Sequence, residues 1–227
     1  MVQPGLNAPQ GHWAQAPRSV VGLGKAAWIL AYVTAGAALI LAFGEWHAYS
    51  LARDYLAGRG ATVADVVAAD NLDSRLSLFS VATTIATAVL LIVWAYQARQ
   101  NAELICTMQH RRSRGWVIGA WFCPVVNLWF PPMIVEDIYR ASMPSTRHDQ
   151  VSSIGMPGVP LIRFWWAPFI LAGVVTYFTS RDTNTLDGLH TEVVGFVLRG
   201  LLLVASAVPL MRIIRRVSEW QLEPKQH

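Results

Sequence analysis

The chain has 227 residues, of which 54% are hydrophobic and only 14% are charged, whereas soluble globular chains carry about 25% charged residues. This composition excludes an ordinary soluble domain and indicates an all-α, polytopic membrane helix bundle. The formal net charge of +4 is spread over loops and tails, and no basic stripe carries interleaved aromatic residues, so no nucleic-acid partner is expected.

The N-terminal residues 1–19 are rich in Pro, Gln, Gly and Ala, which predicts a disordered cytoplasmic tail. Residues 26–43 then form an uncharged run behind Lys25, long enough to nearly match a hydrocarbon core of roughly 30 Å. We expect this run to be the first span and an uncleaved signal anchor, because it is too long and too far from the start for a signal peptide. Residues 20–221 are predicted to form a single membrane domain, and residues 222–227 a short tail.

A polar, acid-leaning segment follows at residues 44–75. Gly58 and Gly60 divide it, so we expect two short helical pieces that lie on the membrane surface or on the bundle. Thr62 and Asp65 have the spacing of a capping box. The carboxylates lack the spacing of an EF-hand loop, so a solvated acidic face is favoured over a calcium site.

Three further spans are predicted, at about residues 76–96, 164–180 and 193–211, and the last of them contains Arg199. Residues 97–110 are expected to continue the second span as a polar helix. Small hydroxyl side chains recur at helical spacing in the second span: Ser77, Ser80, Thr83, Thr84 and Thr87. Close helix packing is the favoured interpretation of these hydroxyls, and a polar lining for a substrate path is the alternative.

The segment Arg111–Ser142, RRSRGWVIGAWFCPVVNLWFPPMIVEDIYRAS, decides the topology. If part of it crosses the membrane, the chain has five spans, and the Lys and Arg residues divide 10 to 7 between the two sides. If it returns on the side where it enters, both termini are cytoplasmic, and 13 of these residues lie inside against 4 outside. The excess of Lys and Arg on cytoplasmic loops favours the second arrangement.

Prolines in this segment favour the same arrangement, because each proline inside a helix removes a backbone hydrogen bond. Irregular backbone at membrane depth requires cover by protein or water. We therefore predict a Pro/Trp-rich re-entrant or interfacial segment at about residues 115–142, made of two short helices, 115–123 and 132–142, that meet at 124–131. Pro132 suits the first turn of the second helix. A kinked fifth span remains the alternative.

The central stretch at residues 115–142 closely resembles the signature of a family of bacterial, mostly actinobacterial, membrane proteins known as domain of unknown function 4328. The residues that carry this resemblance are GWVIGAWFCPVVNLWFPPMIVEDIYRAS. The resemblance includes VWAYQARQNAEL upstream, and the pair Trp165–Trp166 and the final span with Gln221 downstream, so that it covers roughly residues 25–221. It implies a multi-span integral membrane protein. It brings no established activity, cofactor or catalytic residue to this chain.

Several residues are candidates for function because they are polar, aromatic or helix-breaking at membrane depth: Trp121, Pro124, Asn127, Trp129, Pro131, Asp137 and Arg199. An intramembrane arginine such as Arg199 is either functional or snorkels to the headgroups. For Asn127, capping of the broken backbone is favoured over an amide aimed into a cavity. Glu136 and Asp137 are expected to pair with arginines among Arg111, Arg112, Arg114, Arg215 and Arg216. The candidate lipid-contacting residues are Arg111, Arg112 and Arg114.

No metal or cofactor is expected, because Cys106, His110 and Cys123 supply too few ligands with a supporting shell. The chain also lacks the zinc, nucleophile-elbow and phosphate-loop motifs of enzymes, so no catalysis is predicted. The favoured function is a non-catalytic plasma-membrane module that binds lipid, a membrane-protein partner or a second copy of itself through its Arg/Trp-rich cytoplasmic face. The alternative is a small-molecule transporter or channel component that acts as an oligomer.

Overall fold

The computed structural model describes residues 17–146, 159–179 and 185–222, all of the secondary structure in these ranges being helical. Four long helices form the molecule: α1 (Val21–Leu56), α2 (Val63–Ile105), α5 (Pro160–Thr179) and α6 (Leu186–Leu222). Between α2 and α5 lie three short elements, α3 (Trp116–Gly119), η1 (Val126–Leu128) and α4 (Phe130–Ser142), and η2 (Pro144–Thr146) follows α4. The predicted tails at residues 1–16 and 223–227 lie outside the described residues.

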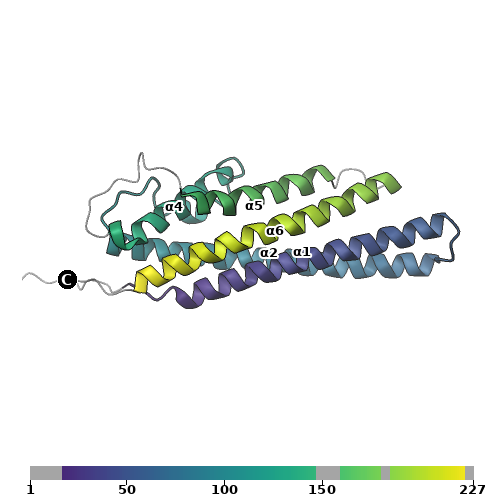
Figure 1. Cartoon of the computed structure of the whole chain (residues 1–227), viewed down its shortest axis with the longest axis horizontal. Helices are drawn as coiled ribbons and strands as arrows, with labels where there is room; N and C mark the ends of the chain where they lie inside the picture. Colours follow the sequence, from purple (N-terminus) through teal and green to yellow (C-terminus); the bar gives the residue numbers. More distant parts are fainter. Residues whose placement is uncertain (1–16, 147–158, 180–184, 223–227) are drawn as a thin grey trace, which may run out of the picture.

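The four long helices run side by side along the length of the molecule (Figure 1). Each is long and apolar enough to cross a membrane, which confirms the predicted multi-span helix bundle. Large apolar side chains are exposed along them, for example Leu78 and Phe79 on α2 and Phe164 on α5. In water such surfaces would be a liability, whereas in a bilayer they face acyl chains.

The helices extend well beyond the predicted spans. The sequence predicts two short, separate helical pieces in residues 44–75, and this prediction is wrong. These residues instead continue α1 to Leu56 and start α2 at Val63. The turn between them uses two glycines at positive φ, Gly58 at 65° and Gly60 at 91°. A capping box then starts α2, with the Thr62 hydroxyl accepting from the backbone N–H of Asp65 and the Asp65 carboxylate accepting from that of Thr62.

The end of α2 also differs from the prediction of a polar helix over residues 97–110. The helix stops at Ile105, and Cys106 is extended, with φ −135° and ψ 137°. The chain leaves the helix here because Cys106 and Met108 pack against Ala141 of α4, in a small buried cluster that also contains Ala102. The segment after α2 is thereby held against the central elements.

The central segment returns to the end of the bundle where it begins. The start of α1, the end of α2, α4, the start of α5 and the end of α6 all lie at this end, which we call the inner end (Figure 1). Helix α3 and its following turns cover residues 116–122, and α4 begins at Phe130 with Pro131 and Pro132 in its first turn. The predicted pair of short helices joined by a broken stretch is therefore present, and this segment is not a fifth long helix.

The main hydrophobic core lies at the inner end, where the central elements are wedged among α2, α5 and α6. Trp94 of α2, Ile138 of α4 and Ile213 of α6 are each completely buried there. Farther along, α1 meets its neighbours through small residues such as Ala35 and Ala38, both buried. Small residues let helix backbones approach closely, which is the usual basis of packing between membrane spans.

Candidate functional site

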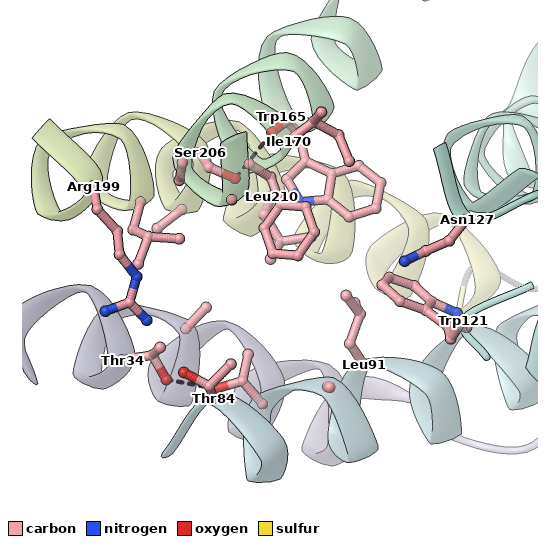
Figure 2. A pocket seen from close by; sticks show the side chains of 18 residues that line it. Thr34, Thr84, Leu91, Trp121, Asn127, Trp165, Ile170, Arg199, Ser206 and Leu210 are labelled. Atoms are coloured by element: carbon pink, nitrogen blue, oxygen red, sulfur yellow. Dashed lines mark hydrogen bonds between the residues drawn. The ribbon is translucent and has the colours of Figure 1, made fainter. Parts of the chain in front are cut away.

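A cavity of about 370 Å³ lies inside the bundle, between α1 and α2 on one side and α5 and α6 on the other (Figure 2). Trp121 and Asn127 of the central segment close its inner end. Its walls are mostly apolar, and the cavity falls within the size range of pockets for small organic ligands. The side chains that line it include Thr34, Thr87, Trp165, Phe169, Arg199 and Leu210.

Arg199 of α6 lies at the opposite end of the cavity from Trp121 and Asn127 (Figure 2). Among the described residues no hydrogen bond or ion pair to its guanidinium is present, and no acidic side chain lines the cavity. An unpaired arginine near the middle of a membrane helix costs about 3 kcal/mol on insertion scales, which makes Arg199 a candidate for ligand binding. Of the candidates from the sequence, Arg199 has the position best suited to ligand binding.

Hydroxyl groups from α1 and α2 lie on the same side of the cavity as Arg199. The Thr34 and Thr87 hydroxyls are 2.8 Å apart and hydrogen bond to each other across the two helices. The Thr84 hydroxyl donates to the Ser80 carbonyl and also lines the cavity. The sequence leaves two roles open for these hydroxyls, close helix packing and a polar lining. Thr87 has both, because it contacts α1 through Thr34 and also lines the cavity.

The inner wall of the cavity is fixed to α5 by tryptophans. The indole N–H of Trp166 donates to the Leu128 carbonyl at 2.7 Å, and its ring meets Trp121 edge to face, with centroids 6.0 Å apart. Asn127 is predicted to cap the broken backbone, but the N-cap positions of η1 and α4 are Val125 and Trp129, and neither helix has a side-chain cap hydrogen bond. Its Oδ1 is buried without a partner in the described structure, and Asn127 is one of the residues that line the cavity.

An ion-pair cluster outside the cavity anchors the central segment. The Asp137 carboxylate, fully buried on α4, accepts from the Arg111 backbone N–H at 2.9 Å and from its Nε at 2.7 Å. Arg111 also donates to Glu136, and Glu136 accepts from Arg140 and from the Val159 backbone N–H. The cluster thus connects the segment after α2, helix α4 and the residue that precedes α5. The predicted pairing of Glu136 and Asp137 with an arginine of this set is present.

The protonation of this cluster follows from burial and charge. Burial raises the pKa of Asp137, an effect that its hydrogen bonds from Arg111 oppose. The pKa of Glu136 is lowered, because the bonds from Arg111 and the Val159 N–H outweigh its desolvation. Nearby, burial next to the cation of Arg99 lowers the pKa of His110 to about 4, so this imidazole is neutral at physiological pH. Ion pairs here stabilise the fold, and none of these groups lines the cavity.

The remaining candidates from the sequence lie away from the cavity. Pro124 and Trp129 are exposed, and Pro131 is buried in the first turn of α4. Arg114 pairs with Glu103, and the guanidinium of Arg112 lies over the Phe130 ring, 4.2 Å from its centroid. Arg111, Arg112 and Arg114 therefore all make contacts within the chain, and their contact with lipid stays a prediction.

Sequence reasoning missed most of the cavity. Thr34 of α1, with Trp165, Phe169 and Gly173 of α5, was not singled out as lining residues, because each has an ordinary place in an apolar span. A small or polar residue in a span rich in large apolar side chains is the signal that could have found Thr34 and Gly173, whereas Trp165 and Phe169 carry no such signal. The described residues contain no group of three or more His, Cys, Asp or Glu side chains that could hold a metal ion.

These features define a multi-pass helical membrane protein with a cavity between its spans. The sequence matches the family described as domain of unknown function (DUF4328) over residues 57–219, more than half of the chain, and the protein belongs to this family. The matched range includes α2, the central segment and α5, but not α1. No curated protein and no solved structure matches the chain. An actinobacterial source stays a prediction.

Proposed function

We propose that this protein is a non-catalytic membrane module that binds a lipid-like molecule in the cavity between its spans. The observation that carries the proposal is the cavity itself, an apolar space of about 370 Å³ with a cationic side chain at one end. Ligand pockets combine predominantly apolar walls with a few polar groups that orient the ligand. Here the polar groups are Arg199, the threonine hydroxyls of α1 and α2, and Asn127.

This proposal keeps lipid as the ligand but moves the site from the cytoplasmic face into the bundle. Arg111 and Arg114 are engaged by carboxylates of the chain itself, so their charge is largely neutralised before any lipid headgroup arrives. Arg199 is not neutralised in this way by any described residue. A cation without an internal partner is the better candidate for binding an external one.

The cavity supports binding over catalysis. Its lining contains no His, Cys, Asp or Glu, so it offers no nucleophile with an adjacent base and no carboxylate pair. The hydroxyls that line it are engaged with threonines or with helix carbonyls: Thr34 with Thr87, Thr84 with Ser80, and Ser206 with Trp165. Activated serine or threonine nucleophiles instead contact a base.

Filling the cavity tests the proposal. Gly173 lines the cavity and Gly36 of α1 does not, yet a Cβ built on either glycine meets nothing within 4 Å. We expect Gly173→Leu to remove most of the lipid that co-purifies with the protein, because the side chain occupies the ligand's space. The matched Gly36→Leu variant gains the same helix propensity and should retain that lipid. Lipid extracted from purified protein is quantified by mass spectrometry.

Two results would contradict the proposal. One is an equal amount of bound lipid in wild type and Gly173→Leu. The other is an equal loss in Gly173→Leu and Gly36→Leu, which would place the lipid on the outer surface of the helices. Size-exclusion chromatography of both variants verifies that each remains folded.

We further propose that the protein lies in the plasma membrane with both termini in the cytoplasm. The four spans and the return of the central segment to the inner end support an even number of crossings. Thirteen Lys and Arg residues then lie on the cytoplasmic side against four outside. We expect alkaline phosphatase fused after His227 to be inactive and a fluorescent protein fused there to glow. An active phosphatase would reject this orientation.

A further inference from the structure

We propose that the ligand is a single-chain amphiphile with one negative charge on its head, a carboxylate, and that Arg199 binds this head. The inference rests on the proposed function, since it names the class of molecule that the cavity holds. It adds a position for each part of the ligand: the head at Arg199 and the chain toward Trp121 and Asn127.

The shape of the cavity favours a single chain. On α6 its lining residues run from Arg199 to Leu210, a separation of about 16 Å at 1.5 Å per helical residue. On α5 the lining runs from Trp165 to Gly173, about 12 Å. The cavity therefore extends along the helices, and its volume of about 370 Å³ suits one acyl chain better than two long chains. Leu91, Phe169 and Leu210 provide apolar contacts along its length.

The polar groups at the end of the cavity opposite Trp121 and Asn127 favour an anionic head. The guanidinium of Arg199 lies near Thr34 and Thr84 in the same part of the cavity (Figure 2). Guanidinium groups bind carboxylates through two parallel hydrogen bonds. The Thr84 hydroxyl donates to the Ser80 carbonyl, but in the Thr34–Thr87 pair one hydroxyl accepts from the other and keeps its own hydrogen for a ligand oxygen. A neutral head would leave the arginine without a counter-charge in an apolar space, whereas an anion compensates it.

The number of charges limits the head to a single negative charge. Arg199 is the one charged residue among those that line the cavity, and no lining residue is acidic. A dianionic phosphate monoester would bring a second negative charge with no partner into the low-dielectric interior. If Arg199 instead only snorkels to the outer headgroups, the cavity has no preference between an acid and an alcohol of equal chain length. A comparison of the binding of an acid and an alcohol of equal chain length therefore decides whether Arg199 binds the ligand's head or only snorkels.

The test uses the full-length protein in phosphatidylcholine nanodiscs and a photoactivatable dodecanoate that carries a diazirine on its chain. After irradiation, peptide mass spectrometry identifies the labelled residues, and dodecanoate, dodecan-1-ol and dodecyl phosphate compete with the probe. We expect labelling on the cavity-facing residues of α5 and α6. Competition by dodecanoate should occur at a concentration at least tenfold lower than competition by the alcohol or, at pH 8, by the phosphate.

Variants then assign the preference to one side chain. Arg199→Gln should reduce the acid-over-alcohol ratio to near unity, and Arg199→Lys should retain most of it, because a cation remains. Arg212→Gln is the matched control: Arg212 is exposed on the same helix and does not line the cavity. It should leave the ratio unchanged.

Each failure has its own pattern. Cavity labelling with equal competition by acid and alcohol in the wild type overturns the anionic head but leaves the binding cavity intact. Stronger competition by dodecyl phosphate than by dodecanoate overturns the single charge. An unchanged ratio in Arg199→Gln removes Arg199 from the site. Labelling spread over the outer surface of the helices, and insensitive to Gly173→Leu, overturns the proposed function itself.

Discussion

Replacement of Asp137 by alanine should lower the stability of the protein by about 3 kcal/mol, the lower end of the range measured when one partner of a buried ion pair is removed, because Arg111 is 22% exposed and keeps Glu136 as a partner. The Asp137 side chain has 0% exposure and accepts two hydrogen bonds from Arg111. Alanine would leave the Arg111 backbone N–H and Nε without these acceptors at a partly buried position. We expect the loss to appear as earlier unfolding when sodium dodecyl sulfate is titrated against protein in mild detergent.

A surface ion pair at the same end of the bundle provides the control. Glu219 lies 3.7 Å from Arg215, and both side chains are about 60% exposed, so Glu219→Ala should change stability by less than about 1 kcal/mol. Cys106 gives a local readout, because it is 5% exposed and packs against Ala141 of α4. In a Cys123→Ser background, Asp137→Ala should make Cys106 reactive to maleimide. Equal stability of the Asp137 and Glu219 variants would refute the anchoring role of the cluster.

The spans could be predicted from the sequence because the bilayer sets their length. Apolar runs such as the uncharged 26–43 and 193–211, with its single Arg199, are recognised by length alone, and both lie inside longer helices of the structure. The helix ends could not be predicted in the same way. Residues 44–56 are polar enough to look like a loop, yet they continue α1, because α2 runs antiparallel beside them and provides packing outside the apolar run.

The return of the central segment was predictable from two independent physical constraints. Prolines at 124, 131 and 132 are poorly compatible with a continuous span, and the distribution of Lys and Arg opposed a fifth crossing. The pairing of Asp137 was predictable as well, since a carboxylate at this depth requires a partner. The choice of Arg111 among five arginines was not, because it depends on where the chain turns after Ile105.

The cavity was beyond prediction from the sequence because it is a property of packing. Arg199 was recognised as unusual, but its surroundings come from α1, α2, α5 and the central segment, whose relative rotation no local pattern specifies. Asn127 shows the same limit. An asparagine at this position is compatible with a helix cap and with a cavity wall, so the residue type does not decide between them. The packing of the segment against Trp166 of α5 places Asn127 in the wall.

Gly24 lies where α1 packs closely against α6 at the inner end, and we expect the closeness of this contact to influence the width of the cavity farther along the two helices. A Cβ built on Gly24 would lie 2.7 Å from Cγ2 of Ile214, 3.0 Å from Oγ of Ser218 and 3.1 Å from Nε1 of Trp94. Trp94 and Ile214 are almost completely buried, and the Trp94 indole donates to Ser218. None of these side chains has free space into which it can move, so the glycine is required by close packing.

We therefore expect Gly24→Val to lower stability by about 3 kcal/mol, at the upper end of the usual cost of overpacking a core. Gly22→Val is the matched control, since a Cβ on Gly22 meets nothing within 4 Å in the same turn of α1. Valine has a better helix propensity than glycine, so this control should be neutral or slightly stabilising. The stability of both variants is measured by the same detergent titration.

Because Gly24→Val forces α1 away from α6, it should also weaken retention of the co-purified lipid, which Gly22→Val leaves unchanged. Equal stability of the two variants would show that α1 tolerates a wider separation, and that Gly24 does not determine the width of the cavity.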